Sequence, residues 1–390
     1  MKVGIITFHF AHNSGAVLQC WALQQKLIEM GFEPEVIDYQ PNYHKGRYAI
    51  IRNPFLFVHN NWLISTEKTP KKFITSLSIF IKTILGNRKF SSRKKQQYKF
   101  RDFLINYLHL SPEMLSMNDS IPLNYDAIIC GSDQIWNINL TKGSFDTHYF
   151  AKTQGFKGIK IAYAASVGEL NISKHAHELT ILLHDFINIS TREEKSALQL
   201  SNILHRTVAT VPDPTVLIDR NQYNKFIESK SPEKPYILVY SLENSSLLKN
   251  TIEFVASKMQ LDVIDMSPIA VKLDTNHIHV SDIGPKDFLS YIYHARYVIT
   301  NSFHGTVFSH ILEKPISVVS HTTRNTRIAD FLSACGTLGT LIYSDENIAD
   351  SFSNIINYKE VSSKLNIYRQ TGEQFLTNSL KSKQNRSDFI

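Results

Sequence analysis

The feature that most constrains the fold is an alternation of apolar strand patterns and helix patterns that occurs twice along the 390-residue chain. The strand patterns of the first series are at 2–7, 35–39, 126–130 and 159–164. Residues 15–30 form its clearest helix pattern, and a second series occupies 236–319 after a polar, proline-containing stretch at 221–235. Strand–helix–strand units place their strands in parallel. The sequence therefore predicts an α/β protein with two Rossmann-like domains that face each other across a cleft.

The two series set the expected domain limits. We expect an N-terminal α/β domain over residues 1–228, with a basic helical insertion at about 42–118, and a C-terminal α/β domain over 229–360. Residues 361–390 are expected to form a C-terminal helix and a polar tail. Thr191 or Ser190 is expected to cap a helix that follows, because hydroxyl side chains accept hydrogen bonds at helix N-termini.

The positive charge is concentrated in one segment. Residues 45–101 hold 14 of the 42 Lys and Arg residues and a single acidic residue, Glu67, whereas the net charge of the whole chain is +7. Three interpretations are open: a solvated hairpin packed on its own domain, an anionic membrane surface, or nucleic acid. Apolar residues at helical spacing, from Phe73 to Ile84, favour the membrane over nucleic acid. No nucleic-acid motif accompanies the charge, so we expect no nucleic-acid partner.

Several protein classes are excluded. Three cysteines without a CxxC pair rule out a disulfide scaffold and a zinc ribbon and favour a reducing compartment. The apolar runs are far shorter than the ~20 residues of a membrane-spanning helix. The 16 histidines are scattered without ligand spacing, so we expect no required metal. These features indicate a cytoplasmic protein.

Loops that follow the predicted strands hold the candidate functional residues, because ligands of open α/β sheets bind at the carboxyl ends of strands. Gly15 opens the first helix, and a helix N-terminus favours phosphate. In the loop at 131–137, Ser132 and Asp133 are either caps or sugar contacts. Trp136 of that loop is either a core residue or a stacking platform for a sugar ring.

A third loop, at 300–306, places His304 at the start of a helix after a strand, which suits a general acid or base. Three arginines are candidate contacts for carboxylate or phosphate, because a guanidinium forms paired hydrogen bonds with either group. They are Arg192, Arg324 and Arg327. For each of them alone, a surface salt bridge is the structural alternative.

Five segments together give the chain a family resemblance. They are SGAVLQCWALQ (14–24), DAIICGSDQIWN (126–137), YAASVG (163–168), ISTREEKS (189–196) with VPDPTVL (211–217), and VITNSFHGTVFSHILEKPI (298–316). In this order they resemble the polysaccharide pyruvyl transferase family. The resemblance implies a fold like that of GT-B glycosyltransferases. It also implies phosphoenolpyruvate as donor, bound in the C-terminal domain, and a cyclic pyruvate ketal across two hydroxyls of a sugar.

The resemblance also suggests roles for individual residues. His304 matches the family's motif histidine and is assigned the acid role, and Arg192 is assigned to the anionic groups of the donor. Asp133 is a candidate base. Family members carry an arginine where this chain has Ser302, so either Arg324 or Arg327 replaces that cation or the donor differs. The remaining candidate substrate contacts, taken from the matching motifs, are Ser302, Gly15, Ser132, Gln134 and Trp136.

The expected partners follow from this chemistry. Phosphoenolpyruvate is the co-substrate, with no further cofactor, and the acceptor is a glycan or a polyprenyl-diphosphate-linked saccharide of a bacterial surface polysaccharide or exopolysaccharide. The basic segment 45–101 would then hold the enzyme at the inner face of the membrane. Two other functions stay open: a GT-B-type glycosyltransferase that uses a nucleotide sugar, and a non-catalytic protein that binds polyanions.

Overall fold

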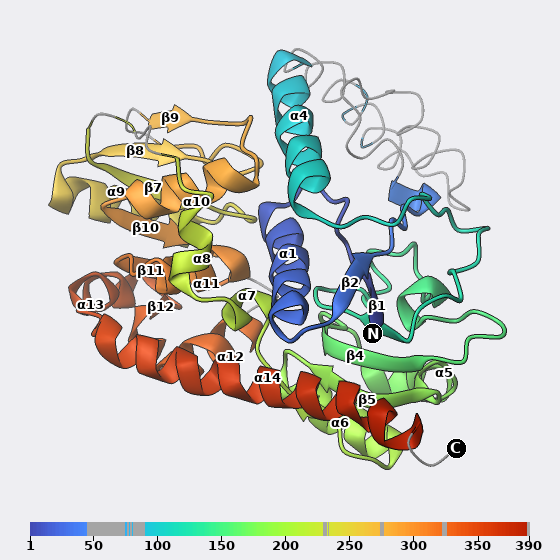
Figure 1. Ribbon diagram of the computed structural model, residues 1–390. Coiled ribbons are helices and arrows are strands. Elements are labelled where there is room, and N and C mark those ends of the chain that lie inside the picture. The colour runs from blue at the N-terminus through green and yellow to red at the C-terminus, as the bar shows by residue number, and fades with distance from the viewer. Residues whose placement is uncertain are drawn as a thin grey trace.

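The computed structural model describes most of the chain. It covers residues 1–44, 75, 78, 80, 90–228, 232, 234–273, 277–321 and 326–387, with side chains described through residue 381. Two parallel β-sheets lie next to each other, and helices flank both (Figure 1). The N-terminal half of the chain forms one sheet and the C-terminal half forms the other. The predicted α/β architecture with two Rossmann-like sheets is confirmed.

The N-terminal sheet has six strands among the described residues, all parallel, in the order β2-β1-β3-β4-β5-β6. Their bounds are β1 Lys2–Ile6, β2 Glu33–Val36, β3 Ala127–Cys130, β4 Ile159–Ala165, β5 Phe186–Thr191 and β6 Ala209–Thr210. Strand β1 lies between β2 and β3, so the strand order reverses direction there. Such a switch point leaves a crevice beyond the carboxyl ends of the two central strands, β1 and β3.

The C-terminal sheet repeats this arrangement with the order β12-β11-β10-β7-β8-β9 in the described part of the chain. Its strands are β7 Tyr236–Tyr240, β8 Asp262–Asp265, β9 His277–His279, β10 Tyr297–Thr300, β11 Ile316–Val319 and β12 Leu341–Ile342. Here the order reverses between β7 and β10. The loops after these two strands therefore border the second crevice.

The helices connect the strands and join the two halves. They are α1 Ser14–Glu29, α4 Phe90–Tyr107, α5 Ala176–Leu183, α6 Glu194–Leu204, α7 Pro214–Leu217, α8 Arg220–Asn224, α9 Ser246–Met259, α10 Pro285–His294, α11 Phe303–Ile311, α12 Thr326–Cys335, α13 Ile348–Ser353 and α14 Tyr358–Ser387. The long helix α14 runs along both halves (Figure 1) and contacts β4 and α7 as well as α12. None of the described helices has both the length and the apolar character needed to cross a membrane.

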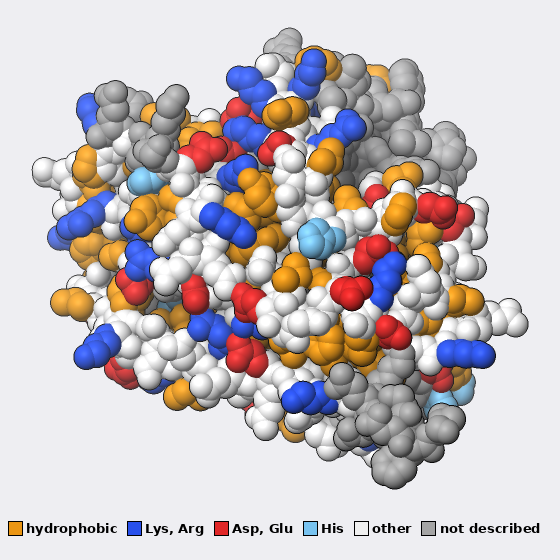
Figure 2. Space-filling view, in the orientation of Figure 1, with side chains coloured by type: hydrophobic (Ala, Val, Ile, Leu, Met, Phe, Trp, Pro, Cys, Tyr) orange, Lys and Arg blue, Asp and Glu red, His pale blue; other side chains and the backbone are white. Residues whose placement is uncertain are grey.

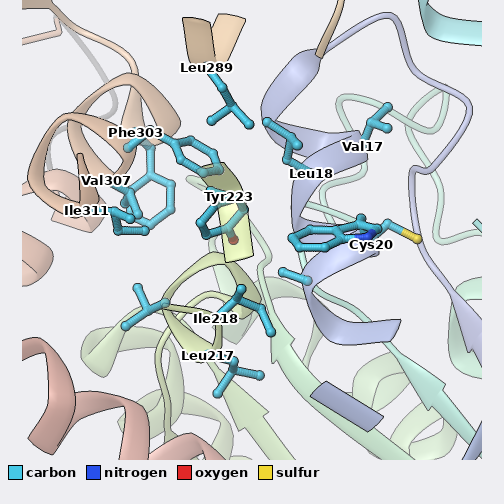
Figure 3. Packing of buried hydrophobic residues seen from close by; sticks show 14 of the residues in the cluster. Val17, Leu18, Cys20, Leu217, Ile218, Tyr223, Leu289, Phe303, Val307 and Ile311 are labelled. Carbon is cyan, nitrogen blue, oxygen red and sulfur yellow. The ribbon is translucent and has the colours of Figure 1, made fainter. Parts of the chain in front are cut away.

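One apolar cluster extends across both halves. Figure 3 shows Leu18 of α1 facing Tyr223 of α8, with Phe303 and Val307 of α11 on the opposite side. Apolar residues occupy most of α1, and Asn13 caps its start by accepting hydrogen bonds from the first backbone amides. Helix α1 is mostly buried and contacts β2 and α7 as well as α10 of the C-terminal half, so the apolar cluster fixes the two sheets relative to each other.

Helix α4 is the described end of the basic segment, and Lys and Arg side chains gather over it (Figure 2). Phe100 and Phe103 are buried in the apolar cluster. On the side of the C-terminal half, Lys99 lies 3.0 Å from Asp287 of α10. Most of residues 45–101, including most of the predicted apolar stripe, lies outside the described residues. The helix α4 itself packs against the protein's own core.

One local prediction is wrong. Ser190 and Thr191 do not cap a helix, because both lie in β5 and helix α6 begins at Glu194, after Glu193. The Ser190 hydroxyl donates to the Ala162 carbonyl of the neighbouring strand instead. The polar stretch at 221–235 lies between the last strand of the N-terminal sheet and the first strand of the C-terminal sheet, and it contains part of α8 and buries two aromatic side chains, Tyr223 and Phe226.

Candidate active site

A cavity of about 300 Å³ lies where the two switch points face each other. From the N-terminal sheet, the loops after β1 and β3 contribute Asn13 and Asp133, among others. From the C-terminal sheet, the loops after β7 and β10 contribute Leu242 and Ser302. Both halves therefore supply the carboxyl ends of their central strands to a single site.

His304 is the central side chain of this cavity. Ser302 caps helix α11 by accepting a hydrogen bond from Gly305 N, which places His304 in the first turn. The imidazole lies against Gly15 at the start of α1, where an added Cβ would come within 2.2 Å of His304 Nδ1. Only glycine lets the two helix ends approach this closely. Nε2 of His304 is buried and has no hydrogen-bond partner among the described residues.

A buried ionic network lies beneath His304. Asp213, which is 2% exposed, caps α7 and receives a hydrogen bond from Arg192 at 2.8 Å. The Ser132 hydroxyl is 3.1 Å from the same Asp213 oxygen. His304 Nε2 lies 3.8 Å from that oxygen, which is longer than a hydrogen bond. Asp213 thus links the carboxyl-end loops of three N-terminal strands to the histidine of the C-terminal half.

The network keeps Asp213 ionised. Burial alone raises the pKa of its carboxyl, but the facing His304, the Arg192 guanidinium and the Thr215 amide outweigh burial and lower the pKa well below its usual range. For Arg192, burial lowers the pKa, whereas Asp213, Asp133 and Glu193 raise it, and the net shift is upward. At neutral pH the network therefore contains a guanidinium between carboxylates.

Two arginines flank one aromatic ring of the site. The Phe303 ring has the Arg192 guanidinium 5.0 Å from its centroid and the Arg327 guanidinium at 5.8 Å. Arg327 lines the cavity, and its Nε lies 3.9 Å from Glu193 Oε1. The negative face of the π-system of an aromatic ring attracts a nearby guanidinium. Phe303 thus fixes Arg327 against the wall of the cavity.

Three helices begin at the cavity. Asn13 caps α1, Ser302 caps α11, and Arg327 belongs to the first turn of α12, and all three residues line the space. A helix N-terminus carries a partial positive charge and unpaired amide donors, so it attracts anions. Their convergence makes the cavity suitable for a small anionic ligand.

The structure gathers most of the predicted site residues, although in two layers. Gly15 contacts His304, and the cavity wall includes Asp133, Gln134, Ser302, His304 and Arg327. Ser132 and Arg192 lie beneath that wall, and Arg192 binds Asp213 and Asp133 rather than lining the cavity. Arg324 lies outside the described residues.

The assignment of Trp136 to substrate binding is wrong. Its indole is fully buried, stacks on Phe150 with ring centroids 5.2 Å apart, and donates a hydrogen bond from Nε1 to the Tyr149 carbonyl. An aromatic residue one turn after a strand can face either the sheet or the ligand. Here the Trp136 side chain lies in the core of the N-terminal half, where its indole contacts Phe150 and Phe186.

Sequence reasoning missed two buried carboxylates. Asp213 lies in the motif VPDPTVL, directly after β6, and Glu193 follows Arg192 after β5. Both positions come after strand ends, which is the available signal. The sequence does not show the partner of either residue. Asp213 and His304, for example, are 91 positions apart and come close only because the two halves pack together.

Facing Rossmann-type sheets with a shared cavity are typical of GT-B-like enzymes. A protein described as a UDP-N-acetylglucosamine 2-epimerase from Listeria monocytogenes has a similar fold, with a TM-score of 0.52 and 10% identity over 99% of this chain and 97% of the other. Another UDP-N-acetylglucosamine 2-epimerase gives a TM-score of 0.51 and 12% identity over 98% of this chain and 96% of the other. At these identities the likeness shows the fold alone.

The sequence identifies the family within that fold. Residues 13–323 match the polysaccharide pyruvyl transferase family, and the match spans both sheets. The chain belongs to this family and is therefore an enzyme, a pyruvyltransferase that acts in polysaccharide biosynthesis. No curated protein matches the chain at a significant level.

Proposed function

We propose that the enzyme transfers the pyruvyl group of phosphoenolpyruvate to two hydroxyls of a sugar, which forms a cyclic ketal and releases phosphate. The observation that carries this proposal is the position of His304 at a cavity where three helix N-termini converge. The donor has a carboxylate and a phosphate, and helix ends favour both. A titratable imidazole beside it suits proton transfer at neutral pH.

The charged side chains at the cavity would not by themselves attract an anionic donor, so the helix N-termini are needed as well. Arg192 and Arg327 face three carboxylates, those of Asp133, Asp213 and Glu193. The ionised side chains therefore leave no surplus of positive charge. The helix N-termini at the cavity would supply it.

Arg327 is our choice for the missing motif arginine. The family position is Ser302 here, and its hydroxyl accepts a hydrogen bond as the cap of α11. Arg327 reaches the same cavity from α12 and is oriented by Phe303. We expect its guanidinium to bind the carboxylate or the phosphate of the donor. Arg192 would act from below, by holding Asp213 and Asp133 in place.

The chemistry needs a proton at the methylene carbon of the donor. His304 gives a proton to that carbon, which becomes a methyl group, and C2 becomes electrophilic. One sugar hydroxyl and then the second form bonds to C2, and the bond from C2 to the phosphate oxygen breaks. The two hydroxyl protons compensate for the proton on the methyl group and for the one carried by the departing hydrogen phosphate.

The direct test supplies the purified enzyme with phosphoenolpyruvate and bacterial polysaccharide fractions and measures phosphate release and ketal formation. We expect both, and replacing His304 by Ala should lower the rate by about 10²–10⁴-fold. A nucleotide-sugar glycosyltransferase would instead release UDP from a UDP-sugar. A non-catalytic polyanion-binding protein would give neither product, with or without His304.

We further propose that the acceptor is lipid-linked and that residues 45–101 hold the enzyme at the anionic inner face of a bacterial membrane. The charge of this segment supports the proposal. Flotation with anionic liposomes tests it on a variant with Arg93, Lys94 and Lys95 changed to Glu. We expect weaker flotation than for the wild type, and equal flotation would contradict the proposal.

A further inference from the structure

A second cavity adjoins the first. Its volume is about 410 Å³, and Arg327 lines both spaces. The second cavity is bordered by the loop after β4, by the start of α6 and by the first turn of α12. All of its lining residues except Gly168 and Leu170 have polar or charged side chains. A ligand there would lie beside the cavity that contains His304.

Glu193 is the buried polar group of this second cavity. It is 3% exposed, and its Oε1 accepts a 2.6 Å hydrogen bond from the Ser166 hydroxyl. Ser166 in turn accepts a hydrogen bond from Gly168 N at 3.1 Å, so one side of the carboxylate is held in place. Oε2 is buried without a hydrogen-bond partner in the described part of the chain. A buried, unpaired carboxylate oxygen is costly, and a ligand that donates a hydrogen bond would remove that cost.

The charges of the cavity favour a neutral ligand. Glu169 and Glu193 carry negative charge, and Lys195 and Arg327 carry positive charge, so the lining is balanced. The other polar lining groups are amides and hydroxyls, which bind sugar hydroxyls as donors and acceptors. They belong to Asn171, Ser173, Ser196, Gln199 and Thr326. A polyol matches this lining better than a second anion does.

We infer that the second cavity binds the acceptor sugar and that Glu193 is the base that activates its hydroxyl, which rests on the proposed function. The attacking oxygen forms its bond to C2 of the donor, and its proton moves to Oε2. When the second hydroxyl attacks, its proton goes to His304, which has already given one to the methylene carbon. The proton on Glu193 leaves with the departing phosphate, so both side chains return to their starting forms.

The other candidate base is less well placed for this role. Asp133 lines the first cavity, but its Oδ1 accepts a hydrogen bond from Gln134 N at 2.8 Å and lies 3.5 Å from Arg192. A guanidinium lies near both carboxylates, since Arg327 Nε is 3.9 Å from Glu193 Oε1. Glu193 differs in that it lines the second cavity and that its Oε2 has no hydrogen-bond partner among the described residues. The geometry therefore favours Glu193 over Asp133.

The test uses methyl glycosides of galactose, glucose, mannose and N-acetylglucosamine as acceptor probes. Saturation-transfer NMR measures their contact with the full-length enzyme, and phosphate release from phosphoenolpyruvate measures turnover. Glu193→Gln keeps the size of the side chain and its bond to Ser166 but removes the base. We expect kcat to fall by about 10²–10⁴-fold, with little change in the KM for the glycoside. Stabilisation of the variant by phosphoenolpyruvate should equal that of the wild type.

Glu178→Gln, an exposed change on α5, is the matched control and should behave as the wild type. Undiminished kcat in Glu193→Gln, or no contact and no turnover of any glycoside with the wild type, would overturn the inference. Loss of phosphoenolpyruvate binding in Glu193→Gln would overturn it as well, because Glu193 would then serve the donor. A wild-type enzyme that phosphoenolpyruvate does not stabilise would instead contradict the proposed function, whatever the NMR result.

Discussion

At the scale of single residues, the contact between Gly15 and His304 joins the two halves of the site. Each residue is in the first turn of its helix, and the helices come from opposite sheets. An added Cβ on Gly15 would lie 2.2 Å from the imidazole. A methyl group has no rotamer that relieves this contact, so the imidazole would have to move. The position of His304, the proposed general acid, therefore depends on the absence of a side chain at Gly15 in the other half of the molecule.

We predict that Gly15→Ala displaces His304 and lowers activity by about 10²-fold, because small misplacements of a reacting group carry a large kinetic cost. The overpacking should also destabilise the fold by about 1–3 kcal/mol, measured by urea unfolding. In a His304→Gly background the three His304 side-chain atoms that the new Cβ would meet are absent, so the clash is gone. There the same change should be neutral or stabilise by up to about 1 kcal/mol, because Ala favours helix over Gly. Equal destabilisation in both backgrounds would contradict the contact.

A second prediction concerns Asp213. Asp213→Asn leaves the buried Arg192 without its 2.8 Å carboxylate partner and should destabilise the enzyme by about 3–5 kcal/mol. Asp133→Asn is the matched control, and it should cost less because Asp133 lies 3.5 Å from Arg192 and is more exposed. Urea unfolding of the two variants beside the wild type gives both values.

The pH dependence of the Asp213 effect has a defined sign. Its pKa is lowered in the folded state, so the carboxylate stabilises the fold above the unfolded value of about 3.9 and ceases to do so as pH falls through the folded value. The stability difference between the wild type and Asp213→Asn should therefore not shrink between about pH 8 and 5, and it should shrink only in more acidic solution. A difference that already shrinks near neutral pH would contradict the ionised network.

The sequence allowed the first layer of the site to be predicted, and Ser132 and Arg192 of the second layer, but not the two buried carboxylates of that second layer. His304, Gln134 and Asp133 follow strands, and that position alone suggests a ligand site. Asp213 and Glu193 are also next to strand ends, but their importance depends on partners brought together by packing. The sequence around Trp136 is compatible with a core residue and with a ligand-binding residue. Its stacking on Phe150 in the structure shows that it is a core residue.

At the scale of elements, α4 shows that a strongly basic helix can also be part of the core. Its inner face buries Phe103, whose ring lies 5.1 Å from Phe226, while Tyr98 on its outer face is 70% exposed. Lys99 on the side of α4 forms an ion pair with Asp287 of α10. Helix α4 therefore packs on both halves of the molecule.

We predict that Phe103→Ala destabilises the enzyme by about 3–5 kcal/mol, the usual cost of removing a buried phenyl ring. Tyr98→Ala on the same helix should change stability by less than about 0.5 kcal/mol, because its ring faces solvent. Thermal or urea unfolding distinguishes the two. Similar small effects for both would mean that α4 does not belong to the core.

Among the elements, runs of apolar residues with clear ends were predictable. Strands β7 Tyr236–Tyr240 and β10 Tyr297–Thr300 lie within the predicted second series, and each is a short apolar run that is buried on both faces. Strand β5 was missed, since its polar Ser190 resembles a cap in sequence. In the structure that hydroxyl is satisfied by the neighbouring strand, and this contact does not appear in a local pattern.

At the scale of the whole molecule, the two sheets place their switch points opposite each other and so form the inter-domain cavity. The apolar cluster of α1, α8, α10 and α11 holds the sheets in this arrangement. The two parallel sheets could be predicted from the repeated strand–helix pattern. Their relative placement could not, because it depends on side-chain packing between segments that are far apart in the sequence.

The most direct test of the central claim, that this cavity holds a small donor with two anionic groups beside His304, is the shift of the unfolding temperature with added ligand. Phosphoenolpyruvate should raise the Tm of the wild type in a saturable way, since a ligand that binds only the folded state stabilises it by RT ln(1 + [L]/Kd). Pyruvate and inorganic phosphate, each with half of the anionic groups, should raise it less. Stabilisation by UDP-N-acetylglucosamine but not by phosphoenolpyruvate would contradict the claim.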